Sequence, residues 1–180
     1  TAIHSHVGLM GRNGQSTHLS APPFRAPHHT SSYASVIGGG THPKPGEISL
    51  AHNGVLFMDE FPEFDKRVLE SLREPMEDNE VRISRSKGTV TFPSDFILMA
   101  ALNPPSAVYR DPTTISQSAV RAFSQKLSGP IMDRIDIWIE VPKIEHSKLV
   151  GQNKSGDSST TIQERVIETR NAQYKRLGSG

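Results

Sequence analysis

The stretch V-L-F-M-D-E, residues 55–60, runs four apolar residues directly into two acids. A short, continuous apolar run is typical of a strand that a parallel sheet buries on both faces. Packing gives no reason for such a strand to end in two carboxylates. Because ligands of doubly wound α/β sheets bind beyond the carboxyl ends of the strands, Asp59 and Glu60 are candidates for chemistry at that edge.

A second strand of the same kind is predicted at residues 96–102, F-I-L-M-A-A-L, and it ends at Asn103. Beside phosphates, an Asp at a strand tip can hold Mg²⁺ through its water shell, and a following Glu can take a proton from an attacking water or orient it. An Asn on the neighbouring strand can bind that water or a γ-phosphate oxygen. One alternative stays open: Asp59 and Glu60 could cap the helix that follows, since acids are favoured in a first turn.

Other elements follow from periodicity. V-R-I-S-R and T-V-T-F, residues 81–85 and 89–92, alternate around S-K-G, which predicts a β-hairpin with Arg85 and Lys87 near its tip and Arg82 close by. Residues 21–54 are rich in Pro and Gly and are expected to be mostly loop with short extended pieces. The remaining predictions are a helix with one apolar face over 61–76, a helix over 116–127, a third strand over 135–141, and a last helix capped by Thr161 with Glu164.

Composition limits the class of protein. The 180 residues suffice for one core. A net charge of +1 gives the chain as a whole no positive field that would attract nucleic acid, so any basic site must be local. The absence of cysteine excludes disulfides and thiolate metal sites. No apolar run approaches the roughly 20 residues that span a bilayer, and no signal-peptide pattern opens the chain. We expect a soluble, cytoplasmic protein without a membrane partner and, since Thr1 comes first, a piece of a longer one.

Several motifs, in order, carry a resemblance to a known family: residues 46–61, the hairpin, the Asn-ended strand, and S-G-P-I-M-D-R-I-D at 128–136. Together they resemble the AAA+ ATPases of the magnesium-chelatase subunit I group. F-R-A-P-H-H-T and P-K-P-G-E-I-S-L-A-H-N-G point to its YifB/ComM-like branch, and the resemblance covers about residues 1–177. It implies an α/β fold: a partial AAA+ P-loop NTPase core, three-layer α/β/α with a mostly parallel sheet and a pre-sensor-1 β-hairpin.

The resemblance assigns roles at matching positions. Asp59 looks like the Walker B residue on the Mg²⁺ side, Glu60 like the catalytic carboxylate, and Asn103 like sensor 1. Arg134 looks like the arginine finger, which in such rings reaches the ATP of the neighbouring subunit. Arginine suits that task because its charge is permanent and its planar fork meets phosphate oxygens in pairs. The alternative is a structural pair of Arg134 with a neighbouring aspartate, Asp133 or Asp136.

One part of the machinery is missing from the sequence. No G-x-x-x-x-G-K-[ST] phosphate cradle is present, and the prolines of G-G-G-T-H-P-K-P-G remove the N–H donors that a cradle requires. In the family the P-loop strand precedes the matching region, and most of the helical lid, with its sensor 2 arginine, follows it. We therefore expect residues 1–145 to be a core without Walker A, 146–161 a linker, and 162–180 the start of the lid. ATP and Mg²⁺ are cofactors expected of the full-length protein, whereas the isolated chain is expected to bind ATP weakly or not at all and to be inactive.

The hairpin resembles one that points into the pore of hexameric rings, where Arg82, Arg85 and Lys87 could follow a DNA backbone. The alternative is a solvated tip whose cations protect an exposed edge. His28 and His29 are adjacent and make a poor chelate, so no metal site is expected from them. The resemblance places F-R-A-P-H-H-T, read as a strand with a polar turn, near the pore or the subunit boundary.

The expected function is the central part of a Mg²⁺-dependent ATPase that, at full length, forms a ring and remodels DNA, for example by branch migration or unwinding during recombination of imported DNA. Two alternatives stay open. One is a chelatase-type ATPase that remodels a metal-insertion partner, and the other is an inactive AAA+-like interaction domain.

Overall fold

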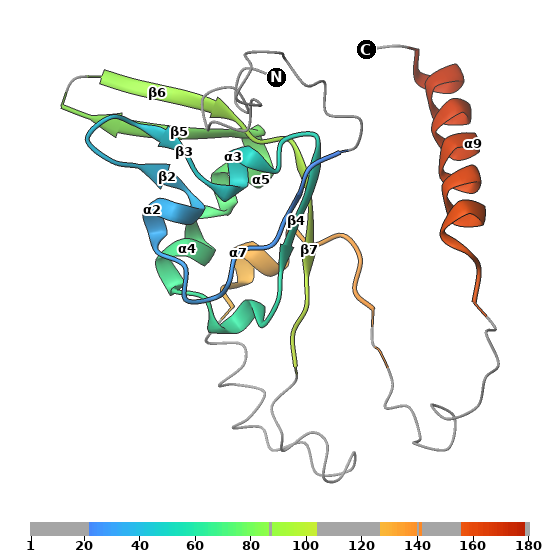
Figure 1. The fold of residues 1–180 in the computed structure, drawn as a ribbon, viewed down its shortest axis with the longest axis horizontal. Coiled ribbons are helices and arrows are strands. Elements are labelled where there is room, and N and C mark those ends of the chain that lie inside the picture. Colours follow the sequence, from blue (N-terminus) through green and yellow to red (C-terminus); the bar gives the residue numbers. More distant parts are fainter. Residues whose placement is uncertain (1–21, 87, 104–126, 140, 142–155, 179–180) are drawn as a thin grey trace, which may run out of the picture. The chain divides into compact units, whose positions relative to one another are not determined.

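The structure is a computed structural model that describes residues 22–86, 88–103, 127–139, 141 and 156–178 (Figure 1). The chain divides into two compact units, residues 1–138 and 139–180, and each is treated by itself. At the centre of the first unit is a three-stranded sheet in the order β1-β4-β7. Its strands are β1 (Phe24–Arg25), β4 (Gly54–Met58) and β7 (Phe96–Ala100).

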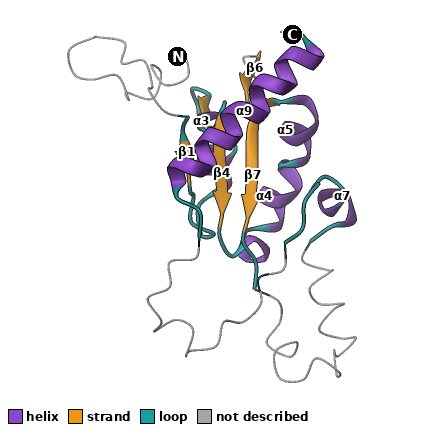
Figure 2. Cartoon of the chain, turned by 90° about the vertical axis from the view of Figure 1, so that its right-hand side faces the viewer, coloured by secondary structure: helices purple, strands orange, loops and turns teal. Residues whose placement is uncertain are grey.

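All pairing in this sheet is parallel. β4 and β7 pair over their whole length, from Gly54 opposite Phe96 to Met58 opposite Ala100, and Figure 2 shows them running side by side in the same direction. β1 pairs with the start of β4 on its other side. The parallel strands predicted at 55–58 and 96–102 are therefore confirmed, and their carboxyl ends lie at one edge of the sheet.

The hydrophobic core lies on one face of the sheet. Leu56 and Met58 are fully buried there, and helices and the hairpin contribute the rest of the cluster. On the opposite face, Ile97 is 59% and Met99 52% exposed, and Phe24 stacks on Phe57 with ring centroids 6.0 Å apart. Burial on both faces was the expectation, and it is wrong for the described residues of the first unit, because the buried helical residues of that unit belong to the cluster on one face.

The single helix expected over 61–76 is broken into three pieces: the 3₁₀ helix η1 (Phe61–Glu63), α4 (Lys66–Ser71) and α5 (Arg73–Asp78). Asp65 caps α4 by accepting the Arg67 N–H at 2.7 Å. The break at Leu72 follows from Pro75. The nitrogen of Pro75 carries no hydrogen, so it cannot donate to the Ser71 carbonyl as a continuous helix would require. The predicted apolar face is nevertheless confirmed: Phe61, Phe64, Val68 and Leu72 are buried, and Met76 packs against them.

Two antiparallel hairpins lie beside each other in Figure 1. The predicted one is confirmed as β5 (Glu80–Arg85) and β6 (Gly88–Pro93). The other joins β2 (Gly38–Gly39) and β3 (Lys44–Pro45) between the short helices α2 (Tyr33–Val36) and α3 (Glu47–Leu50). The hairpins approach closely, since a Cβ placed on Gly39 would lie 3.0 Å from Arg85 Nη2. Residues 22–54 are therefore more ordered than the loop expected from their Pro and Gly content.

The third predicted strand, over 135–141, is wrong in its described part. Residues 135–139 follow the short helix α7 (Gly129–Met132) without forming helix or strand. Ile137 is 76% and Ile139 80% exposed. Alternation signals a strand only where a neighbouring edge can pair with it, and none of the described strands pairs with these residues.

The second unit is described mainly by α9 (Ser159–Leu177). Its N-cap is Ser158, whose hydroxyl accepts the Thr161 N–H at 3.1 Å, so the predicted capping role of Thr161 is wrong. The apolar side chains of this helix are half exposed or more, including Ile162, Val166 and Tyr174. Residues 116–126 of the predicted helix over 116–127 lie outside the described residues.

Among the described helices, none has both the length and the apolar character needed to cross a membrane.

Candidate functional site

The site lies where β4 and β7 end. Beyond the paired residues, the Ala101 N–H donates to the Met58 carbonyl at 3.0 Å, and the Phe61 N–H donates to the Ala101 carbonyl at 2.9 Å. These two bonds hold Asp59 and Glu60 in a short turn at the carboxyl edge of the sheet. Asn103 is exposed two residues beyond Ala101. The structure thus brings the predicted carboxylates and the predicted amide to the ends of adjacent strands.

Glu60 adopts a left-handed backbone conformation, with φ 52° and ψ 43°. This conformation costs about 1 kcal/mol or more for a residue with a Cβ and is concentrated at functional sites. The Asp59 carboxylate holds the turn by accepting the Glu60 N–H at 2.9 Å. Glu60 stands at the N-cap position of η1 but makes no side-chain capping bond, which weakens the capping alternative for this residue.

The Glu60 carboxylate is instead paired with a histidine. Its Oε2 lies 2.8 Å from His29 Nδ1, and the side chains of His29 and Glu60 are 28% and 49% exposed. Sequence reasoning missed this pair, since thirty residues separate the two positions and no local pattern joins them. It did predict a strand with a polar turn at F-R-A-P-H-H-T, which is confirmed as β1 followed by a turn at His29 and Thr30.

β1 is fastened by a second pair that spacing could not reveal. The Arg25 guanidinium forms a bidentate pair with the Glu47 carboxylate: Nε donates to Oε2 at 2.6 Å and Nη2 donates to Oε1 at 2.7 Å. The hydrogen bond with Glu47 is the main cause that raises the pKa of Arg25 above its ordinary value. This pair joins the two motifs that point to the YifB/ComM-like branch.

We expect Glu47→Gln to lower the free energy of unfolding by about 1–3 kcal/mol, because one charge-assisted bond of the bidentate pair is lost in a partly buried place. A raised folded-state pKa of arginine stabilises the fold at every pH below its ordinary value, so the contribution of Arg25 is constant from pH 6 to 9. Urea unfolding of the chain measures the loss. The exposed pair of Arg73 and Glu70, 4.0 Å apart, supplies the control Glu70→Gln, which should leave stability nearly unchanged. Equal effects of both variants would contradict a special role of the Arg25–Glu47 pair.

Arg134 follows α7 and is 21% exposed. Its guanidinium pairs with Glu77 of α5 and donates to the Pro130 carbonyl, while its buried Nε has no hydrogen-bond partner among the described residues. Ion pairing with Asp133 or Asp136 was the structural alternative predicted from sequence, but the described ion pair is with Glu77.

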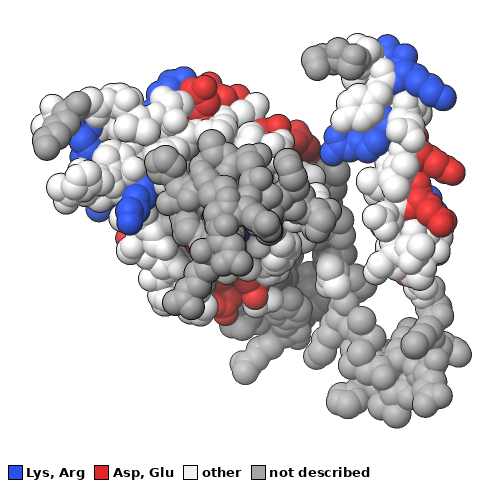
Figure 3. Space-filling model, turned by 45° about the horizontal axis from the view of Figure 1, so that its top comes forward, with Lys and Arg blue, Asp and Glu red and all other residues white. Residues whose placement is uncertain are grey.

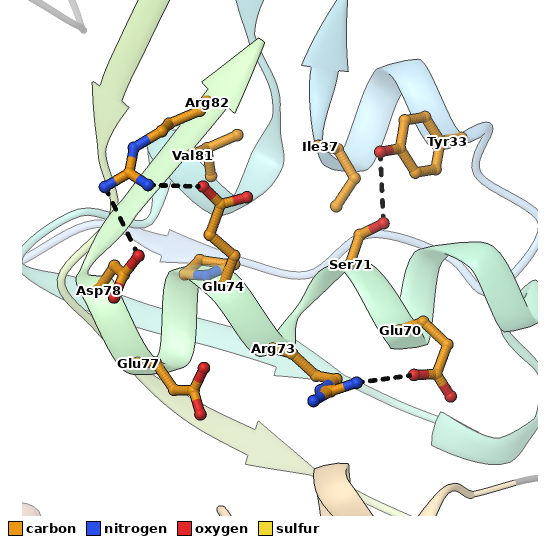
Figure 4. A pocket seen from close by; sticks show the side chains of 11 residues that line it. Tyr33, Ile37, Glu70, Ser71, Arg73, Glu74, Glu77, Asp78, Val81 and Arg82 are labelled. Carbon is orange, nitrogen blue, oxygen red and sulfur yellow. Dashed lines mark hydrogen bonds and ion pairs between the residues drawn. The ribbon is translucent and has the colours of Figure 1, made fainter. Parts of the chain in front are cut away.

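The predicted cations of the hairpin differ in their surroundings. Arg82 lies 3.3–3.6 Å from three carboxylates: those of Glu74 and Asp78, which Figure 4 draws, and that of Glu80. Arg85 lies at the tip, where its Nη1 donates to the Ser84 carbonyl at 3.0 Å. Lys87 lies outside the described residues. Among the described residues of the first unit that are visible in Figure 3, Lys and Arg form separate patches.

The chemistry of the donors fits one half of a Mg·ATP site. Oδ1 of Asp59 accepts the Glu60 N–H, and its other oxygen remains for a magnesium-bound water, a ligand arrangement that suits Mg²⁺. The phosphate cradle is absent from this sequence. Among the described residues, no group of three His, Asp or Glu side chains is placed to hold a metal by itself.

Comparison with known proteins identifies the family of the chain. A family model described as magnesium chelatase, subunit ChlI, matches residues 1–149. The chain is 46% identical over 158 residues to the competence protein ComM of Haemophilus influenzae and 44% identical over 156 residues to the uncharacterized protein YifB of Escherichia coli. These matches cover 87% and 86% of this chain but only 31% of each relative.

A more distant relative is the DNA replication licensing factor Mcm6 of Drosophila melanogaster, which is 31% identical over 93 residues. That match covers 52% of this chain and 11% of the relative. The chain thus spans about a third of the length of ComM and YifB. With the parallel sheet, the confirmed hairpin and the polar strand ends, the family match establishes that this chain belongs to the magnesium-chelatase subunit ChlI family of AAA+ proteins and forms part of an α/β P-loop NTPase core.

Proposed function

We propose that this chain is the central part of a Mg²⁺-dependent ATPase and supplies its Walker B carboxylates, sensor 1 and arginine finger. The observation that carries the proposal is the register of β4 and β7. The two strands end together, so Asp59 and Glu60 lie at the same sheet edge as residues 101–103, which end in Asn103. Ligands of open α/β sheets bind at that edge. The family to which the chain belongs supports the same assignment.

Each residue has a distinct task in this proposal. When bound, Mg·ATP supplies the γ-phosphoryl group and a cation that offsets its charge. Asp59 holds the cation through its water shell. It uses Oδ2 for this, because Oδ1 accepts the Glu60 N–H. Glu60 accepts a proton from the attacking water or orients it. Asn103 hydrogen-bonds that water or a phosphate oxygen, and Arg134 acts on the site of a neighbouring copy.

For the full-length protein we propose a ring, hexameric by resemblance, that remodels DNA. The names of two relatives, a competence protein and a replication licensing factor, support work on DNA. The test is ATPase activity of the full-length protein with and without DNA. Stimulation by DNA is expected. Activity that only a protein partner stimulates would favour the chelatase-type alternative, and no activity under either condition would favour an inactive interaction domain.

The hairpin tip is the proposed contact with the DNA backbone. Since Arg82 is already surrounded by carboxylates, Arg85 and Lys87 are expected to contribute most. Arg85→Ala/Lys87→Ala should weaken DNA binding at low salt and reduce the slope of log K against log salt by about 1–2. Binding isotherms of the full-length protein at several salt concentrations measure this. Arg73→Ala, which removes a cation on α5, is the matched control, and an unchanged slope in the hairpin variant would remove the tip from the DNA site.

A further inference from the structure

We propose that His29 is a positioning residue for Glu60: it holds one carboxylate oxygen so that the other faces the attacking water. The inference rests on the proposed ATPase function and assigns a role to His29 of F-R-A-P-H-H-T, which that function does not use. It stands on the pairing of His29 Nδ1 with Glu60 Oε2 at 2.8 Å.

The register of the sheet accounts for the meeting of these two residues. β1 and β4 are parallel, with Phe24 opposite Val55 and Arg25 opposite Leu56. His29 is four residues beyond Arg25, and Glu60 is four residues beyond Leu56, so the two positions stand opposite each other past the ends of the paired strands. The bidentate bond of Arg25 to Glu47 fastens β1 just before this point.

A backbone turn surrounds His29. The Ser31 N–H donates to the His28 carbonyl at 2.9 Å, which closes the turn. The rings of His28 and His29 lie 4.2 Å apart at 34°. The two histidines are used differently: Nδ1 of His28 is bonded to Thr30 within the turn, at 2.9 Å from its hydroxyl, whereas Nδ1 of His29 reaches across to Glu60.

The pair is suited to orientation more than to stability. Both side chains are partly exposed, and exposed ion pairs contribute little to the free energy of unfolding. Glu60, however, has a left-handed backbone that directs its side chain, and a general base must be held in place to act on water. For Nδ1 to donate to a carboxylate it must carry the proton, so the bond selects one tautomer of His29.

A metal site is the other use that two histidines and a glutamate suggest. The described residues do not support it. Nδ1 of His28 is bonded to Thr30, and no group of three potential ligands is found among the described residues. The contact of His29 with Glu60 is therefore assigned to positioning.

The test compares His29→Leu with His29→Asn in the full-length protein. Leu has a similar size but no donor, whereas the Asn amide places an N–H near the position of Nδ1. We expect His29→Leu to lower kcat for ATP hydrolysis about tenfold or more with KM for ATP changed less than about twofold, and His29→Asn to recover most of the loss. His28→Leu is the matched control and should retain about half of the rate or more, because its Nδ1 does not contact Glu60.

The outcomes separate this inference from the function on which it rests. If Glu60→Gln retains the rate of the unaltered protein, the proposed function fails. If Glu60→Gln is inactive while His29→Leu keeps a normal kcat, or while Leu and Asn lower it equally, the positioning role is overturned. A measurement on the unaltered chain covers variants that fail to fold: in the neutral form of His29, imidazole ¹⁵N spectra should find the proton on Nδ1, and a proton on Nε2 would overturn the inference.

Discussion

Glu60→Gln is expected to lower the ATPase kcat of the full-length protein by about 10²- to 10⁴-fold, the usual contribution of a positioned general base. Gln has nearly the same shape but cannot take a proton from water. Its side chain can still face His29 and fill the same turn, so binding of Mg·ATP should be retained and the fold unchanged. Steady-state hydrolysis measures the first effect, and calorimetric titration with Mg·ATP measures the second.

Glu63→Gln is the control for this experiment. It makes the same chemical change three residues further on, within η1 rather than in the turn between the strand ends, and should leave kcat within about twofold. A Glu60→Gln protein that hydrolyses ATP normally would contradict the Walker B assignment. If ATP binding is lost together with activity, Glu60 contributes to the binding of Mg·ATP as well as to its hydrolysis.

The parts of the fold that could be predicted are those set by local sequence. The β5–β6 hairpin follows from alternation around a Gly-containing turn, and β4 and β7 follow from short apolar runs. Residues 135–139 carry the same alternation, yet they form no strand, because a strand also requires a neighbouring edge that the local pattern does not supply.

The candidate site shows the same limit. Asp59 and Glu60 come after one apolar run and Asn103 after another, so their location at the strand ends could be predicted. The two pairs that fix the surroundings of Glu60, His29 with Glu60 and Arg25 with Glu47, could not, since they depend on which distant strand pairs with β4. Likewise, nothing in M-D-R-I-D indicates that Arg134 reaches Glu77 of α5 rather than an aspartate beside it.

Arg134→Ala is expected to reduce the ATPase kcat of the full-length ring by about 10³-fold, as removal of an arginine finger does. The described contacts of Arg134 are with its own chain, to Glu77 and to the Pro130 carbonyl. A purely structural arginine would therefore also explain a modest loss. Glu77→Gln serves as the matched control: it breaks the ion pair but leaves the guanidinium, so a finger should retain most of the activity.

Mixing two inactive variants distinguishes a finger that acts on a neighbour from a residue that supports its own subunit. Arg134→Ala subunits keep Glu60, and Glu60→Gln subunits keep Arg134. In a ring with head-to-tail interfaces, an equal mixture should assemble both intact groups at about a quarter of the sites. Activity should rise from the background of either variant toward that fraction. If the mixture stays at background although mixed rings form, Arg134 acts within its own subunit, and its bond to Glu77 is its function.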